Sequence, residues 1–93
     1  MPLDKNNKPI LYKPWKNNTQ SNFKYFVYVK SDNKRGYKKI GFGHKKYGQF
    51  KDKLKSYSNL DNNDVKRKKA YYARHGKATS KDTAKYWSHK ILW

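Results

Sequence analysis

The 93-residue chain has no cysteine, so neither a disulfide framework nor a thiolate zinc site can form. It has no glutamate either, because all six acidic residues are aspartate. The apolar run from Phe26 to Val29 is far too short to span a membrane, and Met1 to Ile10 lacks the apolar core of a signal peptide. From these absences we expect one small domain with no membrane partner.

Aliphatic residues are scarce as well. Only 34% of the residues are hydrophobic, yet 17% are aromatic, with nine Tyr, four Phe and three Trp. Large rings bury about 150–250 Å² each when they are packed in a core. We therefore predict a core that rests on a few aromatic side chains.

Positive charge is in large excess. Lys and Arg together number 24 against six acids, which gives a net charge of +18, and they are spread along the whole chain. A chain this far from neutrality repels itself, and binding a polyanion relieves that cost. Solubility alone is the alternative explanation, but it does not require so large an excess of one sign.

Lysine dominates the basic residues, since 21 are Lys and only three are Arg. Lys is a flexible point charge that suits phosphate, whereas Arg makes most of the bidentate contacts that read bases. The composition therefore predicts sequence-tolerant contacts to a nucleic acid, most simply DNA, or to another acidic surface. A small-molecule ligand is not expected.

The segment from Met1 to Asn22 carries all three prolines and a polar stretch. This composition predicts an extended arm over residues 1–22, followed by a single domain over residues 23–93. The apolar residues at which the arm can dock are Leu3, Ile10, Leu11 and Trp15. The sequence leaves open whether they dock on this domain or on a neighbouring subunit.

A β-hairpin is predicted directly after the arm. Phe23 to Lys30 is rich in aromatic and β-branched residues, Ser31 to Gly36 supplies turn residues, and Tyr37 to Phe42 returns as a second strand. The alternation of side chains places four residues of the first strand on one face of the sheet, namely Phe23, Tyr25, Val27 and Val29. Phe26 and Tyr28 then lie on the other face.

The second half of the chain has helical patterns. Gln49 to Ser58 is predicted to form a short helix, because Phe50, Leu54 and Tyr57 recur at helical spacing. Asp64 is the expected N-cap of a second helix that runs to His75 and ends at Gly76.

A last helix is predicted to start near Ser80 or Asp82 and to align Ala84, Trp87 and Ile91. The expected fold class is α+β: a small antiparallel β-hairpin or sheet packed with two or three short helices, plus the extended arm.

Catalytic and metal-binding constellations are weak. Asp61 and Asp64 lie close in sequence, but an Asn-rich turn and an N-cap explain both. His44, His75 and His89 are too far apart in sequence to match a compact zinc pattern. We therefore expect no catalytic residues, no metal and no cofactor, and a protein that is not an enzyme.

The helix from Asp64 to His75 is the best candidate binding element, and the tip of the hairpin is the second. The predicted polyanion-binding residues are Lys66, Arg67, Lys68, Lys69, Arg74 and His75 of the helix, and Lys34, Arg35, Lys38 and Lys39 of the hairpin tip. At 100° per residue Arg67, Tyr71 and Arg74 share one stripe, opposite Val65, Tyr72 and Ala73. The alternative is an ordinary amphipathic helix with a solvated basic face.

Tyrosine and lysine are adjacent at several places, for example in Lys46-Tyr47 and Lys85-Tyr86. Basic residues beside aromatic rings suit single-stranded nucleic acid, because bases stack on the rings. A core short of Leu and Ile must also use Tyr for packing, which is the expected role of most of these tyrosines.

Part of the sequence resembles the start of a GIY-YIG nuclease domain, in Phe26 to Val29, Tyr37 to Gly41 and Lys53 to Tyr57. That family opens with a two-stranded hairpin whose tyrosines frame the active site. Its catalytic Arg would correspond to the neighbourhood of Lys53, and its metal-binding Glu has no counterpart here. The resemblance therefore implies at most a catalytically degenerate relative.

A longer resemblance covers Phe23 to Trp93, through Val27 to Lys30, Lys39 to Gly43, Arg67 to His75 and Tyr86 to Trp93. These elements resemble a family of small basic proteins of unassigned function from nucleocytoplasmic large DNA viruses, with similar short proteins in tailed phages. The resemblance implies a viral source. It also makes Tyr71 the recurrent aromatic of the helix, which favours Tyr71 over Tyr72 as the residue that faces the core.

Three hypotheses follow. The first is a virion protein that binds packaged DNA or an acidic inner capsid surface by charge, with the arm along a neighbouring subunit. The second is a minor capsid or cement protein held by Trp15, Trp93 and the arm, and the third is a divergent nuclease. Under the first, the protein is located in the virion, and in the host cytoplasm or nucleus during infection.

Overall fold

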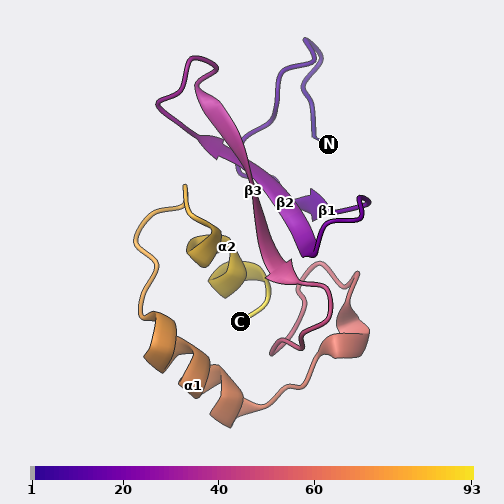
Figure 1. Cartoon of the computed structure of the whole chain (residues 1–93), viewed down its shortest axis with the longest axis vertical. Coiled ribbons are helices and arrows are strands. Elements are labelled where there is room, and N and C mark those ends of the chain that lie inside the picture. Colours follow the sequence, from indigo (N-terminus) through magenta and orange to yellow (C-terminus); the bar gives the residue numbers. More distant parts are fainter. Residues whose placement is uncertain (1) are drawn as a thin grey trace.

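The computed structural model describes residues 2–93, and Met1, the first residue of the predicted arm, lies outside them. The elements follow in the order β1 (Trp15–Lys16), β2 (Phe23–Lys30), β3 (Tyr37–His44), a short 3₁₀ helix η1 (Ser58–Leu60), α1 (Val65–His75) and α2 (Ala84–Ile91). The strands form one antiparallel sheet in the order β1-β2-β3, with α2 packed beside β3 and α1 at one end of the molecule (Figure 1). The predicted α+β class is therefore confirmed.

The hairpin forms as predicted, although β3 continues two residues further, to His44. At its tip Gly36 has a φ of +79°, and its amide donates to Asn33 Oδ1 at 2.9 Å. The additional part of β3 depends on Gly43, whose φ is +72°. A Cβ at Gly43 would lie 2.6 Å from Cδ1 of Leu92, so only glycine lets the chain terminus pack this closely on the strand.

One face of the hairpin forms the core. Tyr25, Val27 and Val29 of β2 are buried there. They form a cluster with Phe42 of β3, Trp87 and Ile91 of α2, and Leu92. Phe23 does not join this face as predicted, because its ring lies over the backbone of Gly41 beside Phe26. It can do so because Gly41 has no side chain to block it.

The N-terminal segment packs on this chain's own sheet. Trp15 pairs with Phe26 in the antiparallel register of β1 and β2, and its ring centroid lies 4.9 Å from that of Tyr28. Tyr12 donates its hydroxyl to Asp82 Oδ1 at 2.5 Å. These contacts place the segment on its own domain.

The predicted helix over residues 49–58 is wrong. Asp52 is buried, and its carboxylate accepts hydrogen bonds from the amides of Leu54 and Tyr57 and from the hydroxyl of Tyr25. A buried carboxylate requires such donors, and local backbone N–H groups that bond to it are withdrawn from a helix. The segment therefore forms turns, with helical structure only in η1.

The two longer helices follow their capping residues. Asp64 Oδ1 accepts hydrogen bonds from the amides of Lys66 and Arg67, and α1 ends at Gly76 with a φ of +68°, as predicted. The last helix begins after the predicted start, because Thr83 is its N-cap. Trp87 and Ile91 are buried, as their alignment predicted, whereas Ala84 is exposed. Within residues 2–93, neither helix has the length and apolar character to cross a membrane.

Candidate nucleic-acid interface

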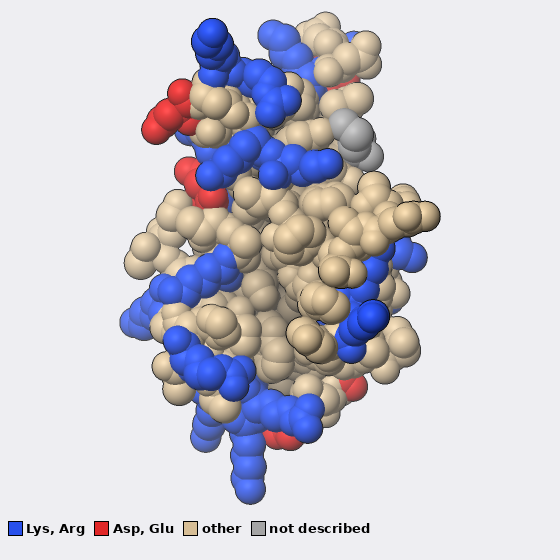
Figure 2. Space-filling model, viewed as in Figure 1, with Lys and Arg blue, Asp and Glu red and all other residues tan. Residues whose placement is uncertain are grey.

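A groove lies where the end of β3 and the loop after it face α1, α2 and the C-terminal residue Trp93. Its volume is about 1420 Å³. The basic side chains along it are Lys24, Lys46, Arg67, Arg74 and Lys85, with His44 and His75. Figure 2 shows the hollow in the lower half of the molecule, with Lys and Arg side chains on both sides of it.

Helix α1 contributes only one of its faces to the groove. Arg67, Tyr71 and Arg74 line it together, as the predicted stripe requires, and His75 joins them. Lys66 and Lys69 are exposed on other sides of the helix, and the ammonium of Lys68 lies 4.4 Å from the ring centroid of Phe50. Of the six polyanion-binding residues predicted on α1, three therefore line the groove and three lie outside it.

Tyr71 is the aromatic residue of α1 that faces the core. Its ring stacks on Trp93 at a centroid distance of 4.5 Å and an interplanar angle of 6°. Its hydroxyl lies 3.1 Å from Ser88 Oγ and 2.9 Å from His89 Nδ1. Because burial also raises its pKa, Tyr71 stays a neutral packing residue and joins α1 to α2.

The face of α1 opposite the arginine stripe makes fewer packing contacts than Tyr71 does. Val65 is 56% exposed and Ala73 is exposed, so neither belongs to the core. Tyr72 is half-buried against the ring of His89. The helix therefore packs through Tyr71, which lies between the two arginines, more than through the face opposite them.

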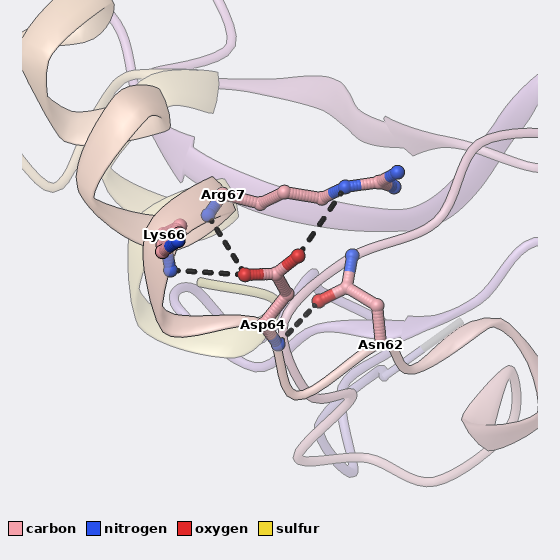
Figure 3. A network of polar contacts seen from close by, with 4 residues as sticks. All are labelled: Asn62, Asp64, Lys66 and Arg67. Atoms are coloured by element: carbon pink, nitrogen blue, oxygen red, sulfur yellow. Dashed lines mark hydrogen bonds and ion pairs between the residues drawn. The ribbon is translucent and has the colours of Figure 1, made fainter.

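Asp64 holds Arg67 in place at the start of α1. The Nε of Arg67 lies 3.6 Å from Asp64 Oδ2, and Asn62 Oδ1 accepts the amide of Asp64 at 2.8 Å. Figure 3 shows the end of the guanidinium extending past Asp64, so its two terminal nitrogens point away from the carboxylate. An exposed ion pair of this kind contributes about 0–1 kcal/mol, and its effect is to orient the side chain.

The groove has no Asp side chain in its lining, among residues 2–93. Three of the aspartates make structural contacts instead. Asp61 accepts hydrogen bonds from the side chain of Gln49 and from the amide of Asp52, Asp82 accepts from Tyr12, and Asp4 accepts the amides of Asn6 and Lys8. The basic residues of the lining are thus opposed by Asp64 beside Arg67, and by Asp52 and Asp61 near Lys24.

Lys24 is the buried basic residue of this lining. Its ammonium donates to the carbonyl of Tyr47 at 2.6 Å and to the side chain of Gln49. Desolvation lowers the pKa of Lys24, partly offset by the charges of Asp52 and Asp61. Lys24 thus holds the loop after β3 in position, a role that sequence reasoning missed because a lysine in a strand normally points into water.

Tyr47 and His44 form a stacked pair on this loop. Their ring centroids are 4.4 Å apart at an interplanar angle of 24°. The amide of Lys46 donates to His44 Nδ1 at 3.1 Å, which fixes the imidazole. Sequence reasoning did not place His44, Lys46 or Tyr47 in a site, and the Lys46-Tyr47 pair was the one signal that pointed to them.

The hairpin tip lies at the opposite end of the molecule from α1 (Figure 1). The long axis measures 44 Å. The guanidinium of Arg35 lies 5.1 Å from the ring centroid of Tyr37, and the ammonium of Lys39 lies 4.5 Å from that of Phe26. Lys34 and Lys38 are exposed. The structure thus does not bring the two predicted groups of basic residues together.

The residues behind the nuclease resemblance do not meet in the groove. The ammonium of Lys53 donates to the carbonyl of Lys90 at 2.5 Å. Tyr28 and Tyr37 pack edge to face at 5.6 Å, on the side of the sheet that carries Trp15. In the described part of the chain, no group of three or more His or Asp side chains lies close enough together to bind a metal ion.

Comparisons with protein families, with characterised proteins and with solved structures found no match to this chain.

Proposed function

We propose that the protein is a non-enzymatic, sequence-tolerant nucleic-acid-binding protein whose binding surface is the groove beside α1. The viral resemblance suggests the setting, a virion component that contacts packaged DNA. Arg67, Arg74 and His75 provide the contacts from α1, and Lys46 and Lys85 add to them from neighbouring segments. The basic residues of the hairpin tip, at the opposite end of the molecule, add to the overall positive charge that attracts the nucleic acid.

The observation that carries this proposal is the charge of the groove. A chain of net charge +18 places three cationic or ionisable residues of one helix face along a concave surface, whose lining includes no Asp side chain among residues 2–93. Cationic side chains that neutralise phosphates release the counterions condensed on the nucleic acid, and this release favours binding. The volume of about 1420 Å³ also exceeds the range of about 300–1,000 Å³ typical of small-molecule sites, which favours a polymer.

The cement-protein alternative has less support. It requires Trp15 and Trp93 to anchor another protein. Both rings pack within the chain, Trp15 on Phe26 and Tyr28 and Trp93 on Tyr71. A tryptophan that already stacks internally has less surface to offer to a partner.

Binding of labelled DNA across a salt series tests the proposed function. We expect the logarithm of the association constant to fall linearly with the logarithm of salt concentration, with a slope of about 0.7–0.9 per phosphate contacted. Scrambled sequences of equal length should bind alike. A poly-aspartate peptide of matched charge serves as the control for an acidic protein surface.

The two outcomes separate the partners. DNA binding that exceeds poly-aspartate binding at every salt concentration supports nucleic acid as the partner. Equal binding of both, or DNA binding that does not change with salt, contradicts the proposal.

A further inference from the structure

Exposed aromatic rings line the same groove as the arginines of α1. Tyr47 is 68% exposed and Phe23 is 45% exposed. Both line the groove, and Phe23 pairs with His44 across β2 and β3, so the three rings belong to one end of the hairpin. The groove therefore combines an aromatic part, from the sheet and its following loop, with a basic part from α1.

Packing explains most tyrosines of this chain but not Tyr47. Tyr25 and Tyr71 are buried, and each has a hydroxyl partner inside the protein. Tyr47 instead covers only His44 and leaves most of its surface in water. An exposed ring beside a line of cationic side chains is the combination that binds bases of a single strand.

The Tyr47 ring is held in place although it is exposed. Its backbone carbonyl accepts the buried ammonium of Lys24 at 2.6 Å, and its ring stacks on an imidazole that the Lys46 amide fixes. A ring that is already ordered loses little conformational entropy when a base stacks on it.

From these contacts we propose that the groove takes a single-stranded nucleic acid, with phosphates on Arg67 and Arg74 and a base stacked on the ring of Tyr47. The faces of bases in a duplex are covered by neighbouring bases, so Tyr47 can reach them only in a single strand. This inference rests on the proposed function and specifies which form of nucleic acid the groove prefers.

Three probes of equal length separate stacking from charge: an oligothymidine strand, an abasic strand and a duplex. The abasic strand keeps the phosphates and removes the bases. We expect the protein to bind oligothymidine about 5- to 150-fold more tightly than the abasic strand, the range that one base-aromatic stack provides. Tyr47→Ala should abolish this preference, and Tyr47→Phe should retain it.

Tyr37→Ala is the matched control, because this ring lies next to the hairpin tip, where it packs on Tyr28 away from the groove. It should retain the preference for oligothymidine. Urea unfolding of each variant checks that the fold is intact.

If the wild-type protein binds the abasic strand as tightly as oligothymidine, the stacking inference is wrong while salt-dependent binding still supports the proposed function. The stacking inference is also wrong if Tyr47→Ala leaves the preference unchanged. If none of the three probes binds, both proposals fail together.

Discussion

Glycine and tyrosine residues determine the local structure around the groove. Gly43 combines a φ of +72° with a close approach of Leu92, whereas Gly36 has a φ of +79° and open space within 4 Å of where a Cβ would lie. Alanine at either position is strained by its backbone, and only at Gly43 does it also meet the core.

Gly43→Ala should therefore cost more stability than Gly36→Ala. We expect about 1 kcal/mol for the backbone strain at each site and about 1–3 kcal/mol more at Gly43 for the displaced Leu92. Urea unfolding of both variants measures the difference. Equal losses would show that Leu92 does not pack on this strand.

Tyr25 makes stability depend on alkaline pH. Burial and the hydrogen bond to Asp52 raise the pKa of its phenol above the ordinary 10.0. A raised pKa in the folded state contributes stability that is complete below about pH 10 and is lost as the pH rises above it.

The advantage of the wild-type protein over Tyr25→Phe should thus be constant between about pH 7 and pH 9. Above about pH 10 it should shrink by up to about 1.4 kcal/mol per pH unit. Urea midpoints over this range provide the measurement. An advantage that persists unchanged at about pH 11 would contradict the burial of this phenol.

Helix α1 is joined to the rest of the protein through Tyr71 and the residues that it contacts. The stack on Trp93 and the hydroxyl contacts to Ser88 and His89 connect it to α2 and the chain terminus. Tyr72 adds a single long hydrogen bond of 3.4 Å to the carbonyl of His89. The position of Arg67 and Arg74 therefore depends mainly on Tyr71.

Tyr71→Phe should lower the free energy of unfolding by about 1–3 kcal/mol, because Ser88 and His89 lose a partner while the stack remains. Tyr72→Phe, the matched control, should cost less than about 0.5 kcal/mol. Amide hydrogen exchange in α1 should rise only in Tyr71→Phe. If both variants behave alike, another contact holds the helix.

Elements with strong local signals could be predicted from the sequence. β2 has its predicted bounds, and α1 has its predicted cap, because alternation and the Asp64 and Gly76 signals lie within a few residues. The segment around Asp52 could not be predicted, since its turns depend on Tyr25, which is distant in the sequence. Which α1 residues face the groove and which face solvent could not be predicted either, because this depends on the stacking of Tyr71 on the distant Trp93.

Across the whole molecule, the position of the basic residues distinguishes the two ends more than their number does. Basic residues lie on both ends of a body 44 Å long, while the concave surface lies at the α1 end. Composition alone predicted a polyanion partner and could not show which lysines and arginines share a surface. The groove forms only when the loop after β3, α1 and the C terminus are brought together.

The central claim is that the groove face of α1, and not its charge in general, binds nucleic acid. Two double variants on this helix test it: Arg67→Gln with Arg74→Gln in the groove, and Lys66→Gln with Lys69→Gln outside it. Each lowers the net charge of +18 by the same amount. The measurement is the affinity for a labelled single strand across a salt series.

We predict that the groove variant reduces the salt slope by about 1.4, the value for two phosphate contacts on a single strand, and that the outer variant reduces it by less than half as much. Equal reductions in the two variants would contradict the account, because binding would then follow total charge and not the groove.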